Sequence, residues 1–282
     1  MHLKKHKKRY ILIAMLLIFV ALGAWILWEN NCPELNYITV QSENLPNEFS
    51  GYRIAHVSDV HNADMVEDLI KLLKKAKPDI IAITGDLVDS YNPDIPTALS
   101  LIKEAVDIAP CYYVKGNHDS AFLSDKEYWN QLSDMGVIIL EDECVTLTKD
   151  GAEITLIGIN DPVIHQQSLE KYPLHVDEML SNLTENRTGF TLLLSHRPDF
   201  FAEYAKNRID LTLTGHAHGG QFRIPFVGGL YAPGQGIFPE YDSGLYKKDS
   251  SQMIVSRGIG NSGFPFRFNN RPEIILVQLQ CG

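Results

Sequence analysis

The stretch "YRIAHVSDVHNADMVEDLIKLLKKAKPDIIAITGD", residues 52–86, contains two apolar segments of strand length with a helical pattern between them. In its middle part, apolar side chains recur at helical spacing from Met65 to Ala76, and Pro78 follows the end of that pattern. A strand, a helix and a second buried strand in this order are typical of an α/β sheet with parallel strands. The stretch therefore predicts an α/β fold.

The alternation of strands and helices continues along the chain. Residues 94–109 and 124–136 have helical patterns, the second with Ser124 as a predicted N-cap, and an apolar strand precedes residues 115–119. The second half is richer in strands, with a hairpin predicted around Asp150 and Gly151. Its other expected strands lie within residues 136–140, 189–196, 210–216, 251–258 and 273–279, and its helices at residues 174–183 and 198–207.

The N-terminus combines a basic block with a long apolar run. Residues 11–28 contain 18 amino acids without charge or proline, about the length that crosses a bilayer. Five basic residues precede this run and none occurs between Trp28 and Arg53, so the positive-inside rule places the N-terminus in the cytoplasm. A cleaved signal peptide normally has a shorter apolar region and a small-residue cleavage site, so a retained anchor is favoured. A buried core helix would fit poorly with the preceding basic block.

These features predict one anchored domain at the cell membrane. The expected organisation is a cytoplasmic tail at residues 1–9, a single-pass transmembrane anchor at residues 10–28, a tether at residues 29–50 and an extracytoplasmic domain at residues 51–282. An edge strand is expected near residues 37–41 within the tether.

The charge of the chain argues against one class of partner. The net charge is −10, and beyond the first ten positions 20 basic side chains face 35 acidic ones, a net charge of −15. Such a domain repels phosphate backbones at long range, so no nucleic-acid partner is expected. The 4 cysteines show no C-x-x-C spacing and are interpreted as small buried or terminal thiols, with their pairing left open.

Each of five apolar strands is followed by residues of the types that bind metals, usually beside a glycine. The residues at these five ends are Asp59 and His61; Asp86 and Asp89; Asn117 and His118; His196; and His216 and His218. Sites in open α/β sheets lie just outside the carboxyl ends of strands, so these side chains can converge. Each motif alone has a simpler interpretation as a turn, a helix cap or a core histidine. Five such coincidences together favour a site.

The ligand types indicate which metals would bind. The candidate ligands are Asp59, His61, Asp86, Asn117, His196, His216 and His218. Mixed nitrogen and oxygen donors without a thiolate suit manganese, iron or zinc in a catalytic role. Because these ligands are too many for one ion, they predict two divalent ions that share a carboxylate, about 3.5–4 Å apart.

The same residues resemble a known family. The motifs D-x-H from Asp59, G-D-x-x-D from Gly85, G-N-H-D from Gly116, the isolated His196 and G-H-x-H from Gly215 look like those of the calcineurin-like metallophosphoesterases. "GHAHGGQ" and "SRGIGNSGFPFRFNNRPEI" are further similar to a bacterial membrane-associated branch of phosphodiesterases, some of which cleave UDP-diacylglucosamine-type lipid precursors. The resemblance implies a four-layer α/β/β/α sandwich with a dinuclear metal site at the carboxyl ends of the strands.

The resemblance also implies roles for the candidate ligands. Asp59, His61 and His218 would hold one ion. Asn117, His196 and His216 would hold the other. Asp86 would bridge the two ions.

Two further residues would act on the substrate instead of the metals. His118 would contact the phosphoryl group or protonate the leaving oxygen, and Asp89 would orient and charge the His118 imidazole. Asn117 and His118 would neutralise charge on the phosphoryl oxygens.

The expected function is metal-dependent hydrolysis of a phosphoester, more specifically of a phosphodiester or pyrophosphate, by in-line attack of a hydroxide formed at the two metals. The alternative is a catalytically inactive scaffold or sensor of the same fold that binds metal. The loops after residue 221 carry many aromatic residues, and Arg223 and Arg267 lie among them. An apolar wall with guanidinium groups would suit a lipid-linked substrate.

Overall fold

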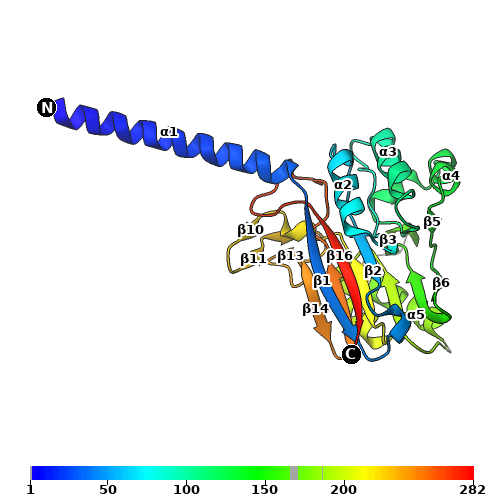
Figure 1. Ribbon diagram of the computed structural model, residues 1–282. Coiled ribbons are helices and arrows are strands. Elements are labelled where there is room, and N and C mark those ends of the chain that lie inside the picture. Colours follow the sequence, from blue (N-terminus) through cyan, green and yellow to red (C-terminus); the bar gives the residue numbers. More distant parts are fainter. Residues whose placement is uncertain (1, 166–170, 186) are drawn as a thin grey trace.

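Two six-stranded sheets form the centre of the domain in the computed structural model, which describes residues 2–165, 171–185 and 187–282 (Figure 1). The first sheet has the order β1 (Glu34–Ser42), β16 (Glu273–Cys281), β2 (Arg53–Val57), β3 (Ile80–Ile83), β4 (Cys111–Tyr113) and β5 (Ile138–Ile139). The second has the order β14 (Gly244–Lys248), β15 (Ser251–Val255), β9 (Leu211–Thr214), β8 (Thr191–Leu194), β7 (Ala152–Gly158) and β6 (Glu143–Lys149).

Helices cover the outer face of each sheet. The first sheet packs against α2 (Val66–Ala76), α3 (Ile95–Ala105) and α4 (Lys126–Asp134), and the second against α5 (Tyr172–Thr184) and α6 (Phe201–Lys206). The continuous apolar strands follow from this arrangement, because neighbouring residues on a strand point to opposite faces. Ile80 lies in the core between the sheets, whereas Ile81 packs under the helices. The predicted four-layer α/β/β/α sandwich is confirmed.

The parallel strands bring their carboxyl ends to shared edges of the sheets. β2 pairs with β3, β3 with β4 and β4 with β5 in parallel register, as the βαβ pattern predicts. In the other sheet, β7, β8, β9 and β15 are also parallel neighbours. The loops that leave β2, β3, β4, β8 and β9 therefore start from the strand ends at which a site was expected.

The N-terminal segment forms α1 (His2–Asn31), which projects away from the domain (Figure 1). By length and composition, residues 8–31 could cross a membrane, and the domain buries none of their most apolar 18-residue window. The end of the helix, at Glu29, is buried against the domain. The expected edge strand is longer than residues 37–41: it is β1, which begins at Glu34 and pairs in parallel with β16 at the edge of the first sheet.

Two local expectations need correction. The N-cap of α4 is Asp125, not Ser124, because the helix begins at Lys126 and the Asp125 carboxylate accepts the backbone N–H of Tyr128 at 3.1 Å. The helix expected at residues 198–207 divides into a 3₁₀ turn, η5 (Pro198–Phe200), and α6. The hairpin around Asp150 and Gly151 joins β6 to β7, and both turn residues have positive φ.

Candidate metal centre

The candidate ligands lie in unusual backbone conformations. Several of them have positive φ angles, a region that side chains other than glycine rarely adopt. These residues, with their φ angles, are Asp59 (50°), His61 (42°), Asp86 (55°), His216 (63°) and His218 (48°). Such strain persists only where the surroundings over-determine the conformation, and it clusters at functional sites. Backbone hydrogen bonds from Asp59 N to Gly85 O (3.1 Å) and from His61 N to Asp86 O (3.2 Å) join the loop after β2 to the loop after β3.

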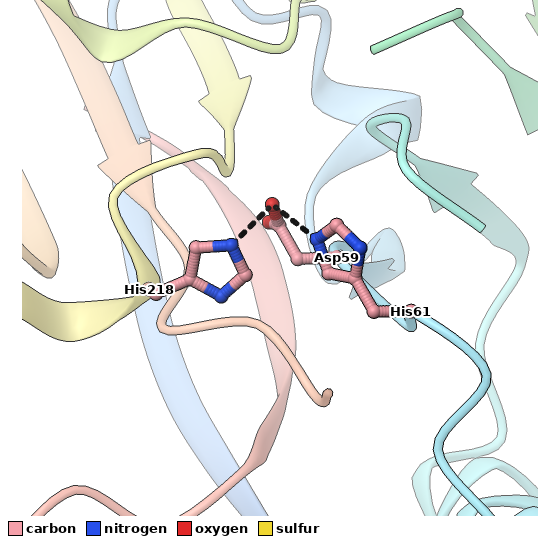
Figure 2. Close-up of side chains that lie close together, drawn as sticks. All are labelled: Asp59, His61 and His218. Atoms are coloured by element: carbon pink, nitrogen blue, oxygen red, sulfur yellow. Dashed lines mark ion pairs between the residues drawn. The ribbon is translucent and has the colours of Figure 1, made fainter. Parts of the chain in front are cut away.

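The first group of donors comes from both sheets. Asp59 and His61 follow β2, and His218 begins the 3₁₀ turn η6 (His218–Gly220) after β9. The Asp59 Oδ1 atom lies 3.5 Å from His218 Nε2 and 3.8 Å from His61 Nε2, so both rings point at one carboxylate (Figure 2). The Asp59 carboxylate also accepts the backbone N–H of His216 at 3.0 Å, which ties the β2 loop to the β9 loop.

A second group lies around Asp86. His196 Nε2 is 3.2 Å from Asp86 Oδ2, 3.1 Å from His216 Nδ1 and 3.1 Å from Asn117 Oδ1. His196 Nδ1 lies 2.7 Å from the Thr84 carbonyl oxygen, which can only accept, so Nδ1 carries a proton and Nε2 is the ring nitrogen that faces the centre.

Asp86 lies between the two groups. Its Oδ2 atom is 3.7 Å from His61 Nε2 on one side and 3.2 Å from His196 Nε2 on the other. Its Oδ1 atom accepts the backbone N–H of His118 at 2.8 Å, which fixes the carboxylate relative to the G-N-H-D loop. The Asp86 carboxylate is thus placed to serve both groups.

The donor set fits divalent cations. Both ring nitrogens of His61 are buried without a hydrogen-bond partner, an arrangement that costs free energy unless another ligand completes it. The donors of Asp59, His61 and His218 lie within 4.8 Å of one another, and those of Asp86, His196 and His216 do so as well. Nitrogen and oxygen donors at such spacing match the mixed ligand sets of manganese, iron and zinc.

The electrostatics of the site also favour bound cations. Burial alone would lower the pKa of His196, but the Asp86 and Asp59 carboxylates raise it to about 10. Burial likewise opposes a charge on His61, yet the nearby carboxylates raise its pKa to about 9. Burial lowers the pKa of His218 to about 3, so that ring is neutral and its lone pair is available. Positive charge is therefore favoured where the carboxylates converge.

Two glycines allow the loops to approach this closely. A Cβ atom on Gly215 would overlap the Ser58 hydroxyl and the Asp59 carboxylate, and one on Gly116 would overlap the Asp86 carboxylate. These glycines are therefore needed for the close approach of the backbone to the side chains of the candidate ligands.

His118 lies beside the donor groups, with its ring centroid 4.6 Å from that of His61. Its Nδ1 atom accepts the backbone N–H of Ser90 at 3.0 Å, so the neutral ring carries its proton on Nε2. Burial lowers the pKa of His118, which favours this neutral form. Asp89 lies nearer to His61 (Oδ2 to Nδ1, 3.4 Å) than to His118 (3.9 Å). The carboxylate expected to orient His118 thus faces both histidines.

Sequence reasoning missed several residues that support the site. Arg197 donates from Nε to Asp161 Oδ2 at 2.6 Å, and its Nη1 atom lies 3.2 Å from His216 Nε2. Asp161 follows β7, so the strand-end rule could have found it, and Arg197 directly follows His196. Asp119, which received no role, accepts from the backbone N–H groups of Asp86 (3.0 Å) and Gly116 and so joins two ligand loops.

A cavity of about 710 Å³ opens onto the donor groups. Its floor includes Asp86, Asn117 and His118, and its wall is largely apolar. The wall residues include Phe222, Leu230, Tyr231, Pro233 and Phe264. A polar floor under an apolar wall is typical of a binding pocket for a small molecule with an apolar portion.

The two arginines expected beside the substrate lie elsewhere. Arg267 is fully buried beneath the site, where Nη1 donates to the Arg257 carbonyl at 2.6 Å and Nη2 lies 3.4 Å from His218 Nδ1. Arg223 pairs with Asp242 at 3.0 Å. The loops fold back on the domain and use both guanidinium groups for their own packing, so neither lines the cavity.

An α/β/β/α sandwich with clustered nitrogen and oxygen donors at its strand ends defines a class of metal-dependent hydrolases. Within that class, the chain belongs to the calcineurin-like phosphoesterase family, whose model matches residues 52–220.

Three relatives are similar over most of this chain. The "uncharacterized metallophosphoesterase YkuE" of Bacillus subtilis (strain 168) is 30% identical over 86% of this chain and 84% of its own length. The "phosphodiesterase YaeI" of Escherichia coli (strain K12) is 27% identical over 81% of this chain and 82% of its own length. The "transmembrane protein with metallophosphoesterase domain" of Danio rerio is 28% identical over 88% of this chain and 57% of its own length.

Proposed function

We propose that the protein is a membrane-anchored phosphodiesterase that uses two divalent metal ions. The observation that carries this proposal is the position of Asp86 between two groups of donors at the floor of the cavity. When bound, manganese, iron or zinc would lower the pKa of a water molecule and offset negative charge on the phosphoryl oxygens. The similarity to a phosphodiesterase of Escherichia coli supports a diester over a monoester substrate.

Different side chains of the protein would hold each ion and position the ligands. Asp59, His61 and His218 would hold one ion, and Asn117, His196 and His216 the other, with Asp86 as the shared ligand. Asp161, through Arg197, would position the His216 ring. These contacts would fix the ligand geometry before the substrate arrives.

His118 would act on the substrate. Because Ser90 N–H occupies Nδ1, the only donor of the neutral ring is Nε2–H, and His118 lines the cavity. That proton would hydrogen-bond to a phosphoryl oxygen or move to the leaving oxygen. Asp89, which lies near both rings, would orient His61 and His118 together.

The direct test is turnover of bis(p-nitrophenyl) phosphate and p-nitrophenyl phosphate by the full chain with added Mn²⁺. We expect the diester to be hydrolysed faster, and chelation of the metal to abolish the reaction. A chain that binds Mn²⁺ but hydrolyses neither compound would support the inactive scaffold instead.

We further propose that the substrate has an apolar portion, such as a lipid-linked diester or pyrophosphate. Phe264, which lines the cavity, packs edge-on against Phe222 at 5.1 Å between ring centroids. Phe264→Ala should lower kcat/KM for a lipid-linked diester about tenfold, because burial of a phenyl ring is worth about 1.5–3 kcal/mol. A water-soluble diester with the same head group should be little affected, in the same detergent.

The matched control is Tyr37→Ala, which removes an exposed aromatic ring on β1 outside the cavity. If Phe264→Ala lowered kcat/KM equally for both diesters, the lipid proposal would be abandoned.

The α1 helix and the name of the Danio rerio relative suggest a membrane protein. We propose a single span with the N-terminus in the cytoplasm and the domain outside. A reporter that is active only outside the cytoplasm should be active when fused after Gly282. Replacing Lys4, Lys5, Lys7, Lys8 and Arg9 with neutral residues should yield mixed orientations, since basic flanks set orientation. A soluble, N-terminally shortened product would instead show that the segment is cleaved.

A further inference from the structure

Two short hairpins beside the cavity expose large apolar side chains. They are β10 (Arg223–Ile224) with β11 (Gly228–Gly229), and β12 (Tyr231–Ala232) with β13 (Gly236–Ile237). Their exposed apolar side chains, here called the hairpin surface, are Ile224 (40% exposed), Phe226 (110%), Val227 (63%), Ile237 (70%) and Phe238 (57%). Phe226 and Val227 lie at the turn of the first hairpin, and Ile237 and Phe238 lie at the end of the second. Soluble proteins rarely expose so many large apolar side chains close together. Where they do, the patch usually marks a site of contact with a protein, a ligand or a membrane.

The hairpin surface carries little charge. Residues 221–239 contain no aspartate or glutamate, and their one basic residue is Arg223. The Arg223 guanidinium is paired with Asp242 at 3.0 Å and donates to the Gly219 carbonyl at 2.9 Å. These apolar side chains can therefore leave water without burying an unpaired charge. The exposed carboxylate of Glu240 lies at the edge of the surface, where it lines the same pocket as Phe226 and Val227 and can stay in water.

The hairpins lie next to the end of α1. The backbone N–H of Asn269 donates to Glu29 of α1 at 2.8 Å, and the Asn269 side chain donates to the Arg223 carbonyl of β10 at 3.2 Å. Trp25 of α1 packs edge-on against Phe268 with ring centroids 5.2 Å apart. Figure 1 shows β10, β11 and β13 on the side of the domain from which α1 emerges.

The junction between α1 and the domain has several fixed contacts. Asn30 accepts from the Arg267 backbone N–H at 2.7 Å and donates to the Arg267 carbonyl at 2.9 Å. The Arg271 guanidinium lies 4.8 Å from the centre of the Trp28 ring. Trp25, Trp28 and Asn30 thus hold the end of α1 against residues 267–271. A membrane crossed by α1 would therefore meet the domain at a defined face.

We infer that the hairpin surface inserts into the lipid interface beside α1 and gives the domain a second membrane contact. The occupant is a bilayer, because the hairpins are joined through Asn269 to the end of α1, the proposed membrane span, and the side chains of the surface itself are uncharged. Exposed phenylalanine, isoleucine and valine side chains with a charged group only at their edge are suited to the boundary between head groups and acyl chains.

The contact has a consequence for access to the cavity. Phe222, Leu230 and Tyr231 line the cavity. Phe222 precedes β10, Leu230 lies between the two hairpins and Tyr231 begins β12. Leu230 N–H donates to the Gly220 carbonyl at 3.1 Å, so the hairpins are tied to the η6 turn that carries His218. When inserted in the lipid interface, the hairpin surface would hold the opening of the cavity close to the membrane, where amphipathic molecules are concentrated.

The test uses tryptophan fluorescence of the full chain in vesicles of phosphatidylcholine with or without brominated acyl chains. Phe226→Trp adds a reporter at the tip, and Leu174→Trp adds one on α5 at a side chain of 65% exposure. The emission of Trp25, Trp28 and Trp129 is removed by subtracting the spectrum of the unaltered chain. Quenching of the added emission measures contact with lipid in either orientation of the protein.

We expect brominated lipids to quench the added emission of Phe226→Trp at least about twofold more than that of Leu174→Trp, with bromines near the head groups more effective than deep ones. Phe238→Trp should behave like Phe226→Trp and serves if the first variant does not fold. Equal quenching at the tip and on α5 would overturn the inference. So would tip emission that depends on the protein-to-lipid ratio and not on bromine, because a second copy of the chain would then cover the surface. The result does not depend on catalysis, so it stands apart from the proposed phosphodiesterase function.

Discussion

Asp86→Ala is expected to cost both metals and reduce kcat/KM on a phosphodiester by about 10³-fold or more, since loss of metal catalysis removes several kcal/mol of transition-state stabilisation. Asp86 is the carboxylate whose Oδ2 atom lies near both His61 and His196. Its loss leaves each group of donors without the shared anion. Elemental analysis of the purified protein should show fewer than one ion per chain, against two in the unaltered protein.

The side chain of Asp86 also accepts from His118 N–H, so the alanine variant loses a loop contact as well as a ligand. Asp86→Asn keeps an acceptor for that N–H but lacks the charge, and it should still bind metal poorly. Asp68→Ala, an exposed position on α2, serves as the control that leaves metal and activity unchanged. An Asp86→Asn protein with two ions and normal turnover would refute the bridging role.

His118→Asn is expected to retain the metals and slow turnover by about 10²–10⁴-fold, the usual contribution of a general acid or base. The replacement keeps a side-chain acceptor for Ser90 N–H. It also leaves the hydrogen bond from the backbone N–H of residue 118 to the Asp86 carboxylate in place. It removes Nε2–H, the donor proposed to reach the substrate. The measurements are kcat on a diester and metal content on the same preparation.

A histidine outside the site provides the comparison for this variant. His175→Asn changes a ring on α5 that packs against His165, and it should leave both kcat and metal content unchanged. Loss of metal in His118→Asn would show that His118 is a ligand. Its ring lies 4.6 Å from the His61 ring between centroids, so the experiment distinguishes two neighbouring histidines with different roles.

The sequence by itself determined that the fold is α/β with parallel strands. The apolar strands and amphipathic helices of residues 52–86 and their repeats predicted parallel strands, and β2, β3 and β4 have that arrangement. Such patterns are local, because the side-chain period of a strand or helix is set by neighbouring residues. The donor types were also evident from the sequence, since each follows a strand and the carboxyl ends of parallel strands share an edge.

Only the tertiary structure decided which side chains meet. Asp59 and His216 are 157 residues apart, and their contact depends on how the two sheets pack. The position of Asp89 near His61, the pairing of Arg197 with Asp161 and the burial of Arg267 beneath His218 likewise join segments from different elements. No short-range pattern encodes such distances, because they depend on the sum of many packing contacts between layers. The sequence thus named the donors, and the packing of one sheet against the other brought them within reach of one another.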